Sequence, residues 1–399
     1  MSILVFNAGS TSLKFGLFDS DATETLVSGA IEWVDGDRSR AKFALRCGHQ
    51  QPAPSTVDVI EEQAAATYAI RALLEEHNIS IVGHRVVHGG SNSGSAARID
   101  DGVKATIASL AEVAPLHNPP ALQAILASEA ALPGVPQVAV FDTGFFAALP
   151  ERAYLFPLPY EWYEKWGVRR FGFHGISNAY CASRAAEMLG RELSELRIVT
   201  CHLGGGCSVT AVRGGVPVAT TMGMTPLAGI MMGTRSGSID PGILIHLMRR
   251  CGLTVEEIDE ALNYRSGLLG LSGVAPDMAA IEAAACEGNV RARLAFEIFA
   301  DSVRSAVGAS AVSMGGVDAL VFTDRIGEGS AALRAAACEG LECIGLRLDA
   351  ERNAACQPDA DLQATDSPGK ILVIHTREEL MIAREARRVA GGESVPSLD

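Results

Sequence analysis

The amino-acid sequence predicts a mixed α/β protein built as two halves. Short apolar segments of strand length alternate with longer segments in which apolar residues recur at helical spacing. A connector crowded with Pro150, Pro157 and Pro159 divides the chain before its midpoint. A strand, a tight turn containing glycine and a second strand occur near the start of each half. Strands and helices mixed in this way pack as α/β layers.

The first half begins with a predicted hairpin, because two apolar strands flank the turn-forming residues 7–12. The other elements expected here are a helix within 57–77, a buried strand over 79–87 and a strand over 137–141 that ends at Asp142.

In the second half, residues 198–210 repeat the arrangement of residues 3–15. One strand–glycine–strand pattern is common, but two of them about 195 residues apart, each heading a half, favour an internal duplication. Residues 214–234 are uncharged but contain five glycines, which indicates a buried functional loop rather than a membrane helix. The remaining predicted elements are helices over 239–251, 254–262, 289–313 and 328–346, strands over 319–322 and 370–374, a polar surface segment over 349–369, and a last helix over 378–389.

Composition and charge narrow the class of protein. The 399 residues carry a formal charge of −14, which argues against binding to nucleic acid or to an anionic membrane. The nine cysteines are odd in number and form no CxxC pair, so they predict free thiols in a reducing cytoplasm rather than a zinc or disulfide framework. The first residues read as a strand and lack the basic segment of a signal peptide.

Two segments at strand ends suit anion binding. The segment Asn7-Ala-Gly-Ser-Thr-Ser-Leu-Lys14 offers small residues, hydroxyls and one cation, and it fits either a phosphate site or an ordinary tight hairpin. It does not have the Walker A spacing. In His84-Arg-Val-Val-His-Gly-Gly90, an arginine at a strand end faces glycines. Its guanidinium could bind a carboxylate or phosphate, or form a surface ion pair.

Further polar residues lie among apolar or glycine-rich neighbours. His117 and Asp142 each stand near an element's end, where a capping or buried structural role is the alternative to a functional one. Glycines bracket His174, His202 and Arg235, which permits close approach of a ligand. These loops collect histidines, arginines and a carboxylate without the spacing of a Ser–His–Asp triad. That set suits phosphoryl transfer, where positioning and charge stabilisation dominate catalysis.

These segments resemble the signatures of the acetate kinase family and follow in the family's order from residue 3 to about 388. They are Asn7-Ala-Gly-Ser-x-Ser-Leu-Lys14, His84-Arg-Val-Val-His-Gly-Gly90, Leu116-His-Asn-Pro119, Phe141-Asp-Thr143, Arg170-Phe-Gly-Phe-His-Gly175, Met231-Met-Gly-Thr-Arg-Ser-Gly237 and Glu378-Glu-Leu-x-Ile-Ala-Arg384.

The resemblance implies two duplicated ribonuclease H-like domains with a cleft between them, as in actin, Hsp70 and sugar kinases. The N-terminal domain would comprise 1–148 plus 376–399, and the C-terminal, nucleotide-binding domain 149–375. It also implies a homodimer that makes acetyl phosphate and ADP reversibly from acetate and ATP. Mg²⁺ would be the metal, and Mn²⁺ could take its place. Neither nucleic acid nor a membrane is an expected partner.

The resemblance assigns roles to individual residues. Arg85 would bind the carboxylate of acetate or acetyl phosphate, and His174 with Arg235 would stabilise the transferring phosphoryl group. Asn7 and Glu378 would hold the metal, and Ser10, Ser12 and Lys14 would line the phosphate site. His117 and His202 would lie beside the transferring phosphoryl group. The methyl pocket would be formed by Val87, Leu116, Phe173 and Pro226. Nucleotide contacts would come from Gly204, Gly205, Gly206, Asp277, Met278, Ala279, Arg325, Ile326, Gly327, Glu328 and Gly329.

Asp142 is the family's essential carboxylate and is often described as an acid or base. Acetate has a pKa of roughly 4 to 5, like a glutamate side chain, so the nucleophile is already ionised at neutral pH. We therefore expect Asp142 to orient an arginine or to hold Mg²⁺ through water. Valine at position 87 leaves little room beside the methyl group, which favours acetate over propionate by about 1–3 kcal/mol.

Three departures from the family pattern fall in the nucleotide half. Gly205 replaces an asparagine, Ala279 replaces a frequent arginine, and Asp324-Arg325 replaces an Ala/Gly-Gly pair where backbone should pass close to adenosine. These changes motivate a hypothesis that the donor is another nucleotide or pyrophosphate, or that ATP binds weakly. The alternatives to an acetate kinase are a propionate kinase and, from another class, a catalytically inactive nucleotide-binding relative.

Overall fold

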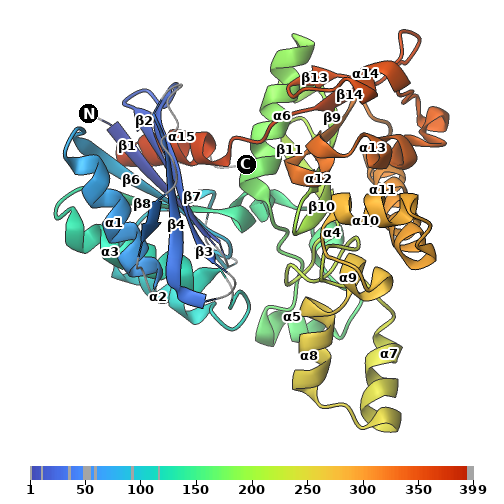
Figure 1. Cartoon of the computed structure of the whole chain (residues 1–399), viewed down its shortest axis with the longest axis horizontal. Helices are drawn as coiled ribbons and strands as arrows, with labels where there is room; N and C mark the ends of the chain where they lie inside the picture. Colours follow the sequence, from blue (N-terminus) through green and yellow to red (C-terminus); the bar gives the residue numbers. More distant parts are fainter. Residues whose placement is uncertain are drawn as a thin grey trace. The chain divides into compact units, whose positions relative to one another are not determined.

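The computed structural model describes residues 2–9, 12–34, 37–47, 55–57, 61–90, 94–115 and 117–392, and it divides into two compact units (Figure 1). The first unit comprises Met1–Ala147, Phe173–Ile176 and Arg377–Asp399, and the second comprises Ala148–Gly172 and Ser177–Thr376. We describe each unit by itself. The boundaries of the folding domains expected from the sequence stay a prediction.

An eight-stranded sheet forms the centre of the first unit, in the order β5-β4-β3-β2-β1-β6-β8-β7. Strands β1, β6 and β8 run parallel, and every other neighbouring pair is antiparallel. The strands are β1 (Ser2–Ala8), β2 (Ser12–Asp19), β3 (Thr25–Val34), β4 (Asp37–Cys47), β5 (Ser55–Val57), β6 (Ile79–Val86), β7 (Ala96–Arg98) and β8 (Gln137–Phe141).

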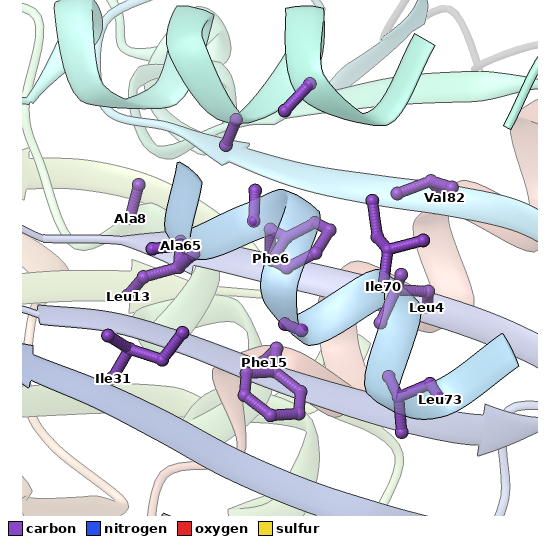
Figure 2. Packing of buried hydrophobic residues seen from close by; sticks show 14 of the residues in the cluster. Leu4, Phe6, Ala8, Leu13, Phe15, Ile31, Ala65, Ile70, Leu73 and Val82 are labelled. Atoms are coloured by element: carbon purple, nitrogen blue, oxygen red, sulfur yellow. The ribbon is translucent and has the colours of Figure 1, made fainter. Parts of the chain in front are cut away.

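Helices cover both faces of this sheet. On one face, α1 (Glu62–Leu74) and α3 (Asn118–Ala131) bury a core that Figure 2 shows in part, with Phe6 and Phe15 of the sheet beside Ile70 and Leu73 of α1. Val82 of β6 belongs to that core, whereas a Cβ on the next residue, Gly83, would meet α15 (Glu378–Ala390). Successive strand residues point to opposite faces, so α15 packs on the other face. The unit also contains α2 (Asp101–Ser109) and the 3₁₀ helix η1 (Asp142–Ala148).

His84 of β6 is a polar residue inside the first core. Its ring stacks on Phe6 at a centroid distance of 5.8 Å, and its Nε2 lies 2.7 Å from Oε1 of Gln137. Burial, opposed only in part by this hydrogen bond, lowers the pKa of His84 from 6.5 to about 4. The neutral imidazole is therefore the form that the core accepts.

This burial predicts a loss of stability in mild acid. Between pH 6.5 and 4 the unfolded chain binds a proton at His84 that the folded chain does not. The contribution is fully present above pH 6.5, and up to about 3 kcal/mol of unfolding free energy is lost as the pH falls to 4. Urea denaturation at several pH values should show a shallower pH slope for His84→Asn than for wild type. Equal slopes would contradict the prediction.

The second unit has a six-stranded sheet in the order β11-β10-β9-β12-β14-β13. Strands β9, β12 and β14 are parallel, and their flanking neighbours are antiparallel. The order and directions repeat those of β3-β2-β1-β6-β8-β7, which confirms the predicted duplicated α/β architecture. The strands are β9 (Arg197–Leu203), β10 (Cys207–Arg213), β11 (Val216–Thr220), β12 (Ala319–Thr323), β13 (Ala360–Asp361) and β14 (Lys370–Val373).

The long helix α11 (Val290–Met314) packs on this sheet and buries Phe299, Val303 and Val307. Its length and position agree with the prediction over 289–313. The other helices are α4 (Glu151–Tyr154), α5 (Tyr160–Trp166), α6 (Gly175–Leu189), η2 (Leu193–Glu195), α7 (Pro241–His246), the π-helix η3 (Leu247–Cys251), α8 (Val255–Tyr264), α9 (Gly267–Ser272), α10 (Met278–Cys286), α12 (Asp324–Gly329), α13 (Ala331–Cys338), η4 (Leu341–Ile344) and α14 (Ala350–Ala354). None of the described helices is long and apolar enough to cross a membrane.

Two predictions of local structure are wrong. The single helix expected over 328–346 is three pieces, because Ser330 caps α13 through its Oγ and Gly340 adopts φ +80°. The segment 349–369 is not purely a surface excursion, since β13 joins the sheet edge and Leu362 is buried.

Candidate active site

The parallel strands of the first unit bring three predicted site residues to one edge of the sheet. Asn7 lies near the carboxyl end of β1, Arg85 near that of β6, and Asp142 directly after β8. In open α/β sheets, ligands bind outside the carboxyl ends of the strands. Glu378, the first residue of α15, lies at the same edge, since it contacts Asn7.

The guanidinium of Arg85 connects this cluster. Its Nε and Nη2 donate to the same oxygen, Oδ2 of Asp142, at 3.1 and 2.7 Å. Its Nη1 donates to Oδ1 of Asn7 at 3.0 Å and lies 3.7 Å from Oε2 of Glu378. The amide of Asn7 in turn donates to Glu378 and to Glu379, at 3.2 and 3.1 Å. One cation thus sits among four oxygen-bearing side chains.

Burial and charge act against each other at Asp142, whose side chain is 0 % exposed. Burial raises the pKa of Asp142 and Glu378 adds to this rise, while Arg85 opposes it. For Arg85, burial favours the neutral form, but the Asp142 and Glu378 carboxylates raise its pKa above the ordinary value. The guanidinium therefore stays charged, and it is the fixed cation of this edge.

The donor atoms here fit a magnesium ion held in part by a substrate. Among the residues that the structure describes, no three His, Cys, Asp or Glu side chains are grouped closely enough to hold a metal by themselves. Mg²⁺ prefers oxygen ligands, keeps several waters and commonly takes only one or two protein carboxylates besides phosphate oxygens. Oδ1 of Asn7 and the carboxylate of Glu378 are oxygens of this kind beside each other.

His174 occupies a strained position next to Asp142. It is a non-glycine residue with φ +58°, directly before Gly175. A Cβ on Gly175 would lie 2.0 Å from the carbonyl oxygen of Asp142, so only glycine permits this approach. The following N–H, of Ile176, lies 3.4 Å from Oδ1 of Asp142. The start of α6 is therefore packed against the carboxylate, and strain of this kind is typical of functional sites.

The residues of the predicted methyl pocket are only partly described. Val87 and Phe173 are buried in the first unit, where the ring of Phe173 meets His88 edge-on at 5.8 Å. Asn118, which sequence reasoning missed, accepts from the backbone N–H of His88 and donates to its carbonyl. Leu116, like Ser10 of the phosphate segment, lies outside the described residues. Pro226 belongs to the second unit.

The remaining phosphate-segment residues lie on β2, with Lys14 exposed and Ser12 half-buried. The backbone N–H of Gly9 donates to the carbonyl of Ser12 and closes the turn between β1 and β2. His117 stands directly before α3. Ser12 and Lys14 thus follow the turn after β1, the strand that carries Asn7 near its end.

In the second unit, β9 and β12 carry the corresponding edge. His202 is near the end of β9 and Gly204, Gly205 and Gly206 follow it, while residues 324–329 follow β12. Nδ1 of His202 lies 2.9 Å from Oγ of Ser177, and its Nε2 lies 3.3 Å from Oδ2 of Asp324. The two loops predicted to meet a nucleotide are therefore brought together.

Arg325 reaches a second loop of this edge. Its Nη2 lies 3.7 Å from Oδ2 of Asp277, although its side chain is 67 % exposed. Asp277 also caps α10, where Oδ1 accepts from the N–H groups of Ala279 and Ala280. The ion pair thus links α12 to α10. Of the other predicted nucleotide residues, Met278, Ile326 and Gly327 are buried, Glu328 is half-buried, and Ala279 and Gly329 are exposed.

Arg235 and Pro226 are also brought together, because Nη1 of Arg235 donates to the carbonyl of Pro226 at 2.9 Å. Burial lowers the pKa of Arg235, and Cys207 and Tyr264 oppose that effect.

Sequence reasoning missed Arg334, the largest fully buried side chain among the residues that the structure describes. Its guanidinium donates to the carbonyls of Gly327 and Glu328 and to Asn353, so it ties the C-terminal end of α12 to α14. Glu379 was missed as well, although its place beside Glu378 in the last signature was a usable signal. Nothing in the spacing around Arg334 distinguishes it from a surface arginine.

The comparisons with known proteins bear on this geometry. A model of the acetokinase family matches residues 2–384. An acetate kinase of Gloeobacter violaceus is 48 % identical over 400 residues, covering 96 % of this chain and 98 % of that protein. The chain belongs to the acetokinase family. The family predicted from the ordered signatures is thereby confirmed.

Solved structures agree with membership of the acetokinase family. Porphyromonas gingivalis acetate kinase is 37 % identical with a TM-score of 0.89, over 98 % of this chain and 99 % of that one. A propionate kinase from Francisella tularensis is 35 % identical with a TM-score of 0.90, over 97 % and 99 %. The predicted two-domain, actin-like fold of acetokinases is therefore confirmed.

Proposed function

We propose that the protein transfers a phosphoryl group reversibly from ATP to acetate, with Mg²⁺, giving acetyl phosphate and ADP. The observation that carries this proposal is the cluster at the ends of β1, β6 and β8. There a charged arginine is clamped by Asp142 and lies beside oxygens that suit Mg²⁺. The family membership supplies the reaction class that such a cluster serves.

In this proposal the chain's own residues bind and orient the reactants. Arg85 binds the carboxylate of acetate, and Asp142 holds the guanidinium by accepting from two of its nitrogens. His174 and Arg235 stabilise charge on the transferring group, where fixed donors are most effective. Asn7 and Glu378 would hold Mg²⁺, which neutralises phosphate charge when bound. Acetate is already ionised at neutral pH, so the nucleophile needs no base.

The test traps acyl phosphate as a hydroxamate, using purified protein, Mg²⁺ and acetate, with ATP, GTP and pyrophosphate compared as donors. Turnover with ATP is the expected result. Turnover only with another donor would make the altered nucleotide loops determinants of donor choice. Absence of product with every donor, in both directions, would overturn the proposal and favour a catalytically inactive relative.

Acetate is the proposed acceptor rather than propionate, although a propionate kinase is among the solved relatives. Val87, which the resemblance places beside the methyl group of the acid, is buried, and we expect it to leave little space for another methylene. One methylene in an apolar pocket is worth roughly 10- to 200-fold in kcat/KM. Comparison of kcat/KM for the two acids distinguishes the two kinases.

A phosphoryl donor other than ATP is a specific alternative. Arg325 stands at a position where the resemblance leads us to expect glycine, and it forms an ion pair with Asp277. We predict that Arg325→Gly changes the KM for ATP, by about threefold or more, because it removes an exposed ion pair and a bulky side chain. The KM for acetate should stay constant. Steady-state kinetics with each substrate varied checks this, and an unchanged KM for ATP would count against a role of Arg325 in donor choice.

We also propose a homodimer in the cytoplasm. No residue of α7 or η3 is buried, and both carry exposed apolar side chains, among them Ile243, Ile245 and Met248. Figure 1 shows α7 and α8 extending away from the sheet of their own unit. Large exposed apolar patches mark interaction sites, and a second copy of the chain would cover this one. The eight cysteines described are free thiols, consistent with a reducing compartment.

The dimer makes its own prediction. Ile243→Glu places a charge in the apolar patch and should shift the protein from dimer to monomer in analytical ultracentrifugation. Val312→Glu is the matched control, because Val312 is 76 % exposed on α11. A wild-type protein that sediments as a monomer would contradict the proposal.

A further inference from the structure

Asp324 has an unusual backbone conformation at the end of β12. It is the first residue after the strand and has φ +64°, a region that few residues other than glycine adopt. Aspartate is one of those that tolerate it. The backbone N–H of Asp324 donates to Oε1 of Glu328 at 3.0 Å, and Arg334 donates to the carbonyl of Glu328. These hydrogen bonds fix the backbone of Asp324 relative to Glu328 and Arg334.

The carboxylate of Asp324 lies across the end of the neighbouring strand. Thr323 of β12 is in register with His202 of β9, so the next residue reaches the turn after β9. Oδ2 of Asp324 is 3.3 Å from Nε2 of His202. The same oxygen would lie 1.7 Å from a Cβ on Gly204, so it rests directly on the first glycine of the turn.

These contacts are those that a phosphate oxygen would make. Glycine turns admit anionic oxygens close to the backbone, and an imidazole N–H donates to them. Ser177 lies 2.9 Å from the other ring nitrogen of His202, Nδ1, so Nε2 is the atom that faces the anion. An ionised carboxylate only accepts hydrogen bonds, as a phosphate oxygen does.

We propose that Asp324 sets the affinity for the phosphoryl donor, because its carboxylate occupies the place of a donor phosphate oxygen at His202 and Gly204. This inference rests on the proposed function, in which this edge receives the donor. A bound donor must either displace the carboxylate from His202 or lie beside it. In the first case a hydrogen bond is lost, and in the second two anions face each other at short range. Both lower the affinity.

The experiment uses the full chain with Asp324→Asn, which removes the charge at nearly constant size, and Asp324→Gly, which suits the positive φ. We expect both variants to lower the KM for ATP and the Kd for ADP, measured by calorimetry, by about tenfold. The KM for acetate should stay within twofold. The gain should shrink between 50 and 300 mM salt, because screening weakens the repulsion. Asp301→Asn is the control for net charge, since Asp301 lies exposed on α11 beside Arg304.

An unchanged or raised Kd for ADP in both Asp324 variants would overturn the inference. So would a gain of the same size in Asp301→Asn, because net charge alone would then explain it. If wild-type protein forms no acyl phosphate with any donor, the proposed function fails, but ADP binding still tests Asp324. Normal turnover with unchanged constants in the variants would instead remove only this inference.

Discussion

Replacement of Asp142 by asparagine is expected to lower kcat/KM for acetate by about 100- to 1,000-fold, with a small effect on the unfolding free energy. Asparagine keeps the size of the side chain but replaces the carboxylate, whose Oδ2 accepts from both Nε and Nη2 of Arg85, with a neutral amide. The guanidinium would still contact Asn7 and Glu378, so the cluster would keep a cation but lose its orientation. Asp101→Asn is the matched control, since that carboxylate is exposed in the same unit.

A double-mutant cycle shows whether Asp142 acts through Arg85. If it does, the double variant Asp142→Asn/Arg85→Ala should have nearly the same kcat/KM as Arg85→Ala alone, because both substitutions remove the same interaction. If the fold-losses of kcat/KM in the two single variants multiply in the double variant, Asp142 has a separate role, such as proton transfer. A kcat that falls with unchanged KM for acetate in Asp142→Asn would also point away from substrate orientation through Arg85.

The sequence predicted what depends on local pattern. The strand over 137–141 and the repeated hairpins follow from apolar runs bounded by turn residues, and the structure has them within one or two residues. The helix expected over 328–346 failed because apolar spacing continued through Ser330 and Gly340, whose capping and positive φ divide it. Periodicity reports which residues are apolar, and it does not weigh a single cap against them.

The candidate site also contains residues that local sequence pattern predicts and contacts that it does not. Asn7, Arg85 and Asp142 could be singled out because each stands near a strand end, and the parallel strands bring them to one edge, whereas Glu378 was named only through the family resemblance. Contacts between distant loops carry no such signal. The approach of Asp324 to Gly204 depends on a side-chain direction and a positive φ that the sequence does not encode locally.

Replacement of Arg334 by methionine is expected to lower the unfolding free energy by about 3–5 kcal/mol. The arginine is 1 % exposed and donates to the carbonyls of Gly327 and Glu328 and to both oxygens of Asn353, at 2.7 to 3.1 Å. Methionine fills a similar volume but donates nothing, so four buried acceptors lose their partner. Urea denaturation measures the change. Arg352→Met is the control, because Arg352 is half exposed and pairs only with Asp361 among the contacts described for its side chain, so it should cost less than about 1 kcal/mol.

The same substitution should separate the two substrates. Gly327 and Glu328 belong to α12, which the resemblance assigns to the nucleotide, whereas Arg85 and Asp142 belong to the first unit. At a temperature where Arg334→Met is folded, the KM for ATP should rise while the KM for acetate stays near that of wild type. Equal increases in the KM for ATP and the KM for acetate would mean that the substitution disturbs the whole protein rather than donor binding alone. A variant as stable as wild type would show that Arg334 is replaceable by packing alone, as some buried ionic groups are.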